Sequence, residues 1–128
     1  MTNSYFALSV KDCNTLAVTD TLATTGVGEV NNTTVSTGYA RLSQAPPAAT
    51  SANPAAIVFT QMSWNTGANT NWPSYVKSVV LCTVPSYVTS GGLTAKAICA
   101  WNLQVGGTQR DLSGANTTES FTPTLTIA

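Results

Sequence analysis

Histidine is absent from this 128-residue chain, and five basic and five acidic side chains bring its charged content to only 8%. An ordinary soluble domain carries roughly 25%. Catalysis near neutral pH depends on histidine or on clustered carboxylates, lysines and thiolates. The charged residues are scattered, and no GxSxG or P-loop spacing occurs. We therefore expect a chain that is not an enzyme, has no catalytic residues and needs no cofactor.

The low charge also limits the classes of partner. The net charge is zero and no basic stripe is present, which argues against nucleic acid and against an anionic membrane surface. No apolar run approaches the ~20 residues that span a bilayer, and the N-terminus has no signal-peptide pattern. We expect synthesis and retention in a cytoplasm until assembly, with neighbouring proteins covering the poorly charged surface.

Metal and thiol sites are poorly supported. The three cysteines, Cys13, Cys82 and Cys99, match no zinc spacing and cannot form a closed disulfide framework. We expect free buried thiols, but Cys82 and Cys99 lie on the two arms of a predicted hairpin, so a thiol pair there stays open. No DxDxDG-like loop supports calcium, and Arg110-Asp111 reads as a solvated turn. We predict no metal site.

Short strand-like segments separated by Gly, Pro and Asn turns account for most of the chain. Residues 79–82 show no polar face and predict a strand buried on both sides. Residues 14–22 fit strand or loop equally, whereas 63–73 and the Pro-rich stretch 45–56 read as connections. The predicted strands are 5–10, 38–44, 57–62, 75–84, 93–105, 119–121 and 124–127. We predict one all-β domain over residues 1–128, an antiparallel β-sandwich, jelly-roll-like or Ig-like, with about 6–8 strands.

Two groups of residues are candidates for protein contact. Trp64, Trp72 and Tyr75 flank a loop of small polar residues and are able to anchor a neighbouring protein, stack on a sugar ring or plug the domain interior. Leu125 and Ile127 lie in the last predicted strand, which is either an internal edge of the sandwich or an edge that accepts another chain. The sequence leaves these alternatives open.

Several short motifs follow one another along almost the whole chain. They are YFALSV at 5–10, Glu29-Val30, TGYARL at 37–42, AIVFT at 56–60, a Trp-containing loop, VKSVVLCT at 76–83, SGGL at 90–93, AWNL at 100–103, Phe121 and LTIA at 125–128. This order resembles that of small structural proteins of tailed bacteriophages, with their GGYAR-like, ITFP-like, SGG and LTITL segments. The chain departs from that pattern by lacking an N-terminal helix and by the extra stretch at 85–89.

The resemblance implies a virion structural protein without catalytic or metal-binding residues. The function we expect first is a capsid decoration or cement protein, made in the host cytoplasm, that binds the major capsid protein on the outer head lattice and forms homo-oligomers. One alternative is a tail or tail-fibre-associated protein that binds a tail protein. Another, from a different class, is a glycan-binding module for host adsorption built on Trp64 and Trp72.

Overall fold

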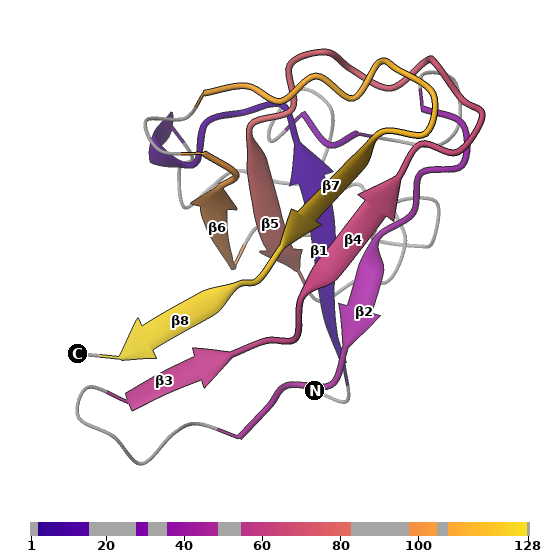
Figure 1. Cartoon of the computed structure of the whole chain (residues 1–128). Helices are drawn as coiled ribbons and strands as arrows, with labels where there is room; N and C mark the ends of the chain where they lie inside the picture. Colours follow the sequence, from indigo (N-terminus) through magenta and orange to yellow (C-terminus); the bar gives the residue numbers. More distant parts are fainter. Residues whose placement is uncertain are drawn as a thin grey trace.

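A computed structural model describes residues 3–15, 28–30, 36–48, 55–82, 98–104 and 108–127. These residues form eight strands in antiparallel sheets and one short 3-10 helix, with no α-helix among them, which confirms the predicted all-β class (Figure 1). The elements are β1 (Ser4–Ser9), η1 (Cys13–Thr15), β2 (Leu42–Gln44), β3 (Ala55–Val58), β4 (Met62–Asn65), β5 (Ser78–Cys82), β6 (Cys99–Asn102), β7 (Thr118–Phe121) and β8 (Thr124–Ile127).

The largest sheet has four strands in the order β2-β1-β5-β6. β1 and β5 are central and pair antiparallel along five residues, with Ala7 opposite Val80. Every residue of β5 is buried, which confirms the strand without a polar face predicted at 79–82. A central strand with both faces covered has no need of the polar alternation that a half-exposed strand shows.

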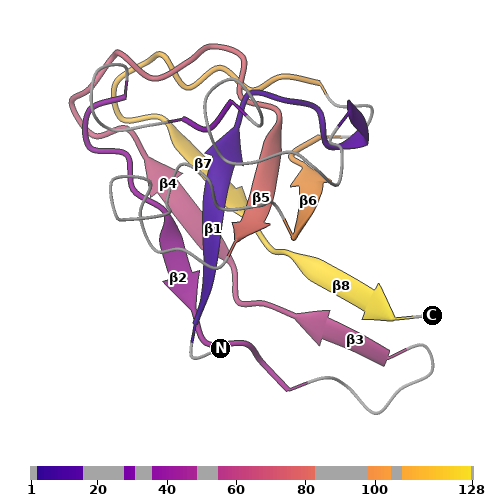
Figure 2. The same ribbon diagram turned by 180° about the vertical axis from the view of Figure 1, so that it is seen from behind.

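The remaining four strands form two separate two-stranded sheets that follow one another along the same two chain segments, and together we call them the ribbon. β4 pairs with β7, and β3 pairs with β8 further along the same two chain segments. Figures 1 and 2 show that β4 and β7 lie across one face of the four-stranded sheet, whereas β3 and β8 extend beyond it toward the C-terminus. We call the β3–β8 part, residues 55–58 and 124–127, the arm.

The core cluster takes side chains from the four-stranded sheet and from the β4–β7 part of the ribbon. Phe6 of β1 meets Phe59 edge to face, with ring centroids 4.9 Å apart, and Met62 and Trp64 of β4 enter the same cluster. Residues from connecting segments, such as Leu112, complete it. The buried members of the cluster are Phe6, Leu8, Val30, Tyr39, Phe59, Met62, Trp64, Trp72, Val76, Val79, Leu81 and Leu112.

Some predicted strand limits differ from the structure. The strand predicted at 57–62 is interrupted, because β3 ends at Val58 and β4 begins at Met62 and continues to Asn65, into the stretch 63–73 that was predicted as a connection. Of the strand predicted at 38–44, only 42–44 pair with β1, since the chain before Leu42 leaves the sheet to bury Tyr39 and Arg41. The predicted turn at 85–92, most of 14–22, and residues 93–97 and 105 lie outside the described residues.

Candidate functional site

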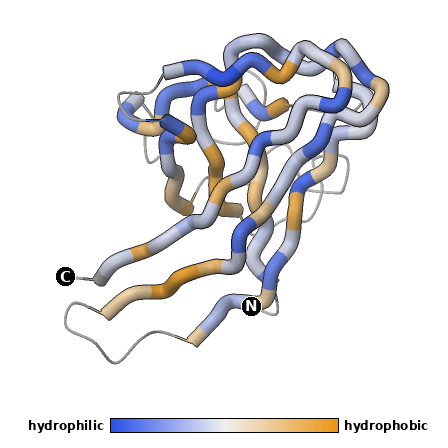
Figure 3. The backbone as a smooth tube through the Cα atoms, in the orientation of Figure 1, coloured by the Kyte–Doolittle hydropathy of each residue, from blue (hydrophilic) through white to orange (hydrophobic). Residues whose placement is uncertain are grey.

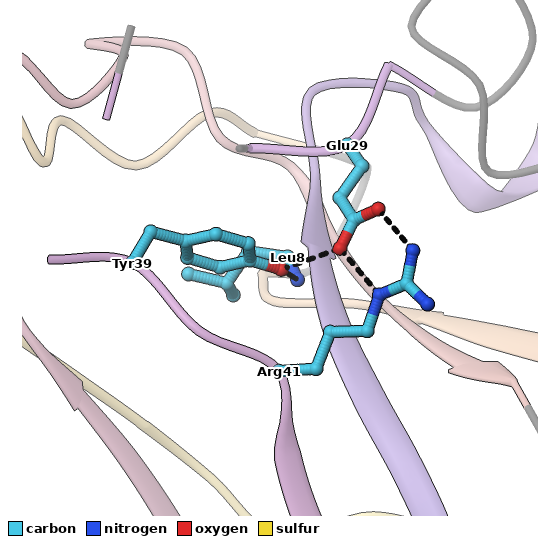
Figure 4. A network of polar contacts seen from close by, with 4 residues as sticks. All are labelled: Leu8, Glu29, Tyr39 and Arg41. Atoms are coloured by element: carbon cyan, nitrogen blue, oxygen red, sulfur yellow. Dashed lines mark hydrogen bonds and ion pairs between the residues drawn. The ribbon is translucent and has the colours of Figure 1, made fainter. Parts of the chain in front are cut away.

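A buried ion pair and a tyrosine hydroxyl form a polar network beside β1 (Figure 4). Arg41 donates from Nε to Oε1 of Glu29 at 2.7 Å and from Nη2 to Oε2 at 2.6 Å. The side chains of both residues are only 1% exposed. The Tyr39 hydroxyl donates to the same Oε1 at 3.1 Å. The two-pronged contact fixes the guanidinium and the carboxylate in one plane, the geometry in which such a pair is strongest.

The network lies where β1 changes its hydrogen-bonding neighbour. β2 pairs with residues 4–6 of β1, and residues 28–30 pair with the end of β1, with Val30 N–H donating to Leu8 O at 2.9 Å. Between these two neighbours the Leu8 N–H faces no strand, and it donates to the Tyr39 hydroxyl at 3.0 Å. Tyr39 thus satisfies a buried backbone donor that would otherwise lose its hydrogen bond to water.

The surroundings of Tyr39 and Arg41 keep each of these two side chains in one protonation state near neutral pH. Burial raises the pKa of Tyr39 well above its ordinary value, and the negative charge of Glu29 raises it further. Burial by itself lowers the pKa of Arg41, but the hydrogen bond and charge of Glu29 outweigh that effect and raise it. Tyr39 therefore stays neutral and Arg41 stays charged, and both are closed off from solvent. The arrangement fits a structural clamp on residues 28–30 and 39–41.

A β-bulge separates the arm from the rest of the ribbon. Phe59 N–H donates to Pro123 O at 3.0 Å, whereas Met62 pairs with Phe121. Two residues, Thr60 and Gln61, therefore lie opposite Thr122 alone. Bulges of this kind bend a ribbon and increase its local twist. Here the bulge is the point at which the arm departs from the body.

The Gln44 side chain, at the end of β2, binds the bulged backbone. Its Nε2 donates to Thr60 O at 2.7 Å, and its Oε1 accepts from Thr60 N–H at 3.0 Å. One carboxamide thus replaces the ladder hydrogen bonds that a bulged residue forgoes. This contact ties the edge of the four-stranded sheet to the base of the arm.

The arm has two faces of different character. Ile57 and Leu125 lie opposite each other and share one face. Ile57 packs against the core, whereas Leu125 is 37% exposed. Val58 and Thr124 form the opposite face, where Val58 is 48% exposed. Ile127 ends β8, with its backbone paired to Ala55. The arm thus carries apolar groups past the edge of the core.

Charge is nearly absent from the whole ribbon. No charged residue occurs from 42 to 76 or after 119, and Glu119 is buried and bound by Arg110 Nε at 2.7 Å. Figure 3 shows the arm in pale and orange colours, without a strongly hydrophilic segment. The outward face of β4 and β7 carries two short cross-strand contacts between polar uncharged groups, Ser63–Ser120 at 2.7 Å and Asn65–Thr118 at 2.6 Å.

The three aromatic candidates occupy different environments. Trp64 and Trp72 are each only 3% exposed, and their indole N–H groups donate to the carbonyls of Ala40 and Thr37 at 3.2 and 2.8 Å. They occupy the interior, so they offer no exposed ring to a sugar or to a protein. Tyr75 is 50% exposed.

The register of the sheet separates the two candidate thiols. Cys99 lies opposite Leu81, so its side chain shares a face with Leu81, while Cys82, the next residue, points to the other face. None of the three cysteines forms a disulfide; Cys82 is buried as expected, whereas Cys13 and Cys99 are only half-buried. A bond between Cys82 and Cys99 is therefore not formed, because strand alternation directs the two thiols to opposite sides. Burial raises the pKa of Cys99 to about 11.

Arg110 and Asp111, adjacent in sequence, have separate partners. Arg110 binds Glu119, and the Asp111 carboxylate accepts hydrogen bonds from the backbone and the hydroxyl of Ser113. Within the described ranges, no group of three or more acidic, histidine or cysteine residues is placed to hold a metal ion. In the same ranges no helix has the length and apolar character to cross a membrane.

Glu29 and Arg41 were not among the residues that the sequence predicted to form a site. A signal was present for Arg41, which is an isolated charge in the strand-like stretch 39–42, but not for Glu29, whose neighbours in sequence are mainly Gly, Thr and Asn. A charge in such a context needs a buried partner of opposite sign. Which of the few available charges supplies it depends on the fold.

Comparison of the chain with known protein families, with curated proteins and with solved structures found no match. The resemblance to phage structural proteins therefore stays a prediction.

Proposed function

We propose that this chain is a bacteriophage virion structural protein, a capsid decoration or cement protein that binds the major capsid protein on the outer head lattice. It is made in the host cytoplasm, associates with copies of itself, and acts through protein contacts rather than catalysis. The observation that carries the proposal is the ribbon, whose single charged residue, Glu119, is buried, together with its arm, which presents apolar and small polar groups beyond the core.

The physical argument concerns desolvation. Ser, Thr and Asn side chains satisfy the backbone groups of a neighbour at a lower desolvation cost than charged side chains do. Copies packed closely on a lattice also bring identical surfaces near one another, where charges of one sign would repel. The outward face of the ribbon meets both conditions, with Ser63, Asn65, Thr118 and Ser120 as its polar groups.

We also propose that the four-stranded sheet and the ribbon are the two layers of an antiparallel β-sandwich. The support is the core cluster, to which the sheet contributes Phe6 and Val79 and the ribbon contributes Met62 and Trp64. A two-layer arrangement places an apolar core about 10 Å thick between the layers. The tightly packed body would then fix the position of the base of the arm.

The test compares particles with and without this protein. Heads that lack it should release DNA at a lower temperature, and addition of the purified chain should restore the wild-type release temperature. Leu125→Asp, which puts a charge on the arm, should impair restoration. Ala115→Asp puts the same charge in the exposed turn at the other end of the ribbon, where Asn116 N–H bonds to Gly67 O, and it should restore fully.

Equal release temperatures with and without the protein would contradict the cement function. The copy number decides between head and tail, because a decoration protein is present in numbers close to those of the major capsid protein. Densitometry of purified virions measures that ratio, and a ratio of only a few copies per particle would favour the tail.

A further inference from the structure

The outer edge of β8 carries backbone groups that point away from its partner strand. In an antiparallel pair, residues alternate between hydrogen-bonded and non-hydrogen-bonded positions. Phe59 N–H bonds to Pro123 O, so Leu125 falls at a bonded position, while Thr124 and Thr126 direct their N–H and C=O outward. A hydrogen bond from Trp101 supports this assignment of inward and outward positions, because its Nε1 donates to the outward carbonyl of Thr124 at 2.9 Å.

Trp101 occupies the outward carbonyl of Thr124, but beyond that residue no side chain of β8 is of a kind that protects an edge against another strand. Sheet edges that stay unpaired in natural proteins usually carry a lysine, a proline or an inward-pointing charge. Residues 124–127 contain none of these, and Thr126 is exposed. The opposite edge of the arm differs, because Ala56, at the outward position of β3, already has an interaction partner. The arm therefore offers one edge for pairing.

We infer that β8 pairs antiparallel with β8 of a second copy of this chain, about a two-fold axis at Thr126. The product is a four-stranded ribbon in the order β3-β8-β8-β3. This inference rests on the self-association included in the proposed function, and it names the surface and the symmetry.

Charge and geometry both favour a second copy as the occupant. A two-fold axis places each residue near its own copy, so any charge on the arm would face the same charge, and the arm has none. With Thr126 opposite Thr126, the outward N–H and C=O of each copy form two reciprocal hydrogen bonds. Leu125 is then at the register position opposite Ile127 of the second copy. One available edge per chain closes the assembly at a dimer rather than a filament.

The test measures the mass of the purified chain by light scattering after size-exclusion chromatography, over a series of concentrations up to about 1 mM. We expect a monomer–dimer equilibrium. Thr126→Pro removes the outward N–H and leaves the β3–β8 hydrogen bonds intact, so it should weaken the dimer roughly ten-fold or more. Thr126→Ala keeps that N–H and is the matched control, which should dimerise like the wild type.

A charge exchange tests the symmetry directly. Thr126→Lys and Thr126→Glu should each be monomeric alone, because like charges meet at the axis. An equimolar mixture of the two should dimerise, because opposite charges then meet. A wild-type chain that stays monomeric throughout, or a dimer unaffected by Thr126→Pro, would overturn the inference. Circular dichroism must first show that each variant retains the wild-type β-sheet signal.

The two proposals fail in distinguishable ways. A wild-type chain that raises the DNA-release temperature of heads but never dimerises would overturn the β8 pairing and leave the cement function standing. A chain that dimerises through Thr126 but leaves the release temperature unchanged would support the pairing and contradict the cement function.

Discussion

Replacement of Arg41 by methionine tests whether the buried ion pair holds this fold together. Arg41→Met keeps the aliphatic part of the side chain and removes both hydrogen bonds to Glu29. The carboxylate of Glu29 then stays inside with only the Tyr39 hydroxyl as the hydrogen-bond donor of the described network. The free energy of unfolding should fall, because a buried charge has lost its counter-charge.

The size of the effect follows from the burial. Removing one partner of a buried ion pair costs about 3 to 5 kcal/mol, and both side chains here are 1% exposed. A whole domain has a stability of only about 5 to 15 kcal/mol. For a chain of this length each kcal/mol shifts Tm by about 4 °C, so Tm should fall by about 12 to 20 °C.

The assay is urea unfolding followed by tryptophan fluorescence, which reports on the buried Trp64 and Trp72. The control is the double variant Glu29→Gln/Arg41→Met, in which the amide oxygen still accepts from Tyr39 and no charge is buried. It should recover about 1 to 3 kcal/mol of the loss. A loss below about 1 kcal/mol, as for a surface ion pair, or a double variant no more stable than Arg41→Met, would refute the reasoning.

Three further predictions address the bulge, the thiol and the turns. Gln44→Ala should lower the free energy of unfolding by about 1 kcal/mol and speed amide exchange at Thr60. Gln44→Glu replaces the amide donor with a carboxylate oxygen that faces Thr60 O, so it should cost at least as much stability as Gln44→Ala; wild-type stability and exchange in both variants would contradict the capping role. Burial raises the pKa of Cys99 from 9.0 to about 11, so the neutral thiol contributes fully to the free energy of unfolding below pH 9.0, and that contribution is lost as the pH rises toward about 11. The free energy of unfolding, measured from pH 9 to 11, should therefore fall less steeply for Cys99→Ala than for the wild type. Gly38 and Gly67 both have positive φ, but only a Cβ at Gly38 meets another side chain, at 3.1 Å; Gly38→Ala should therefore cost more than Gly67→Ala, which should cost about 1 kcal/mol, and the reverse order in urea midpoints would count against this account.

Much of the strand content follows from residue patterns alone. The apolar run at 79–82 needed no partner to be recognised as a strand buried on both faces, because such a composition fits only a central position. The closing strands around Pro123 were also predictable, since proline ends one strand without preventing the next. Alternation along the strand predicted at 93–105 places Cys99, Trp101 and Leu103 on one face, and all three pack against the core cluster.

The bulge and the arm were not predictable from local pattern. Residues 57–62 were predicted as one strand, because a bulge is an extra residue relative to the partner strand and the periodicity of one strand does not reveal it. The bulge at Thr60 and Gln61 exists relative to Thr122, more than sixty positions away. The burial of Trp64 and Trp72 was likewise not predictable, because their indole N–H groups bond to the carbonyls of Ala40 and Thr37, which are distant in sequence.

The sequence by itself determined the all-β class, the burial of β5 and the near absence of charge from the ribbon, because these depend on residue type and short-range alternation. Only the tertiary structure decided that Glu29 binds Arg41, that Cys82 and Cys99 face opposite sides of the sheet, and that the last strand extends past the core. Each of these depends on which distant segments become neighbours and in which register. A shift of one residue in a strand exchanges its faces, and local sequence does not specify that shift.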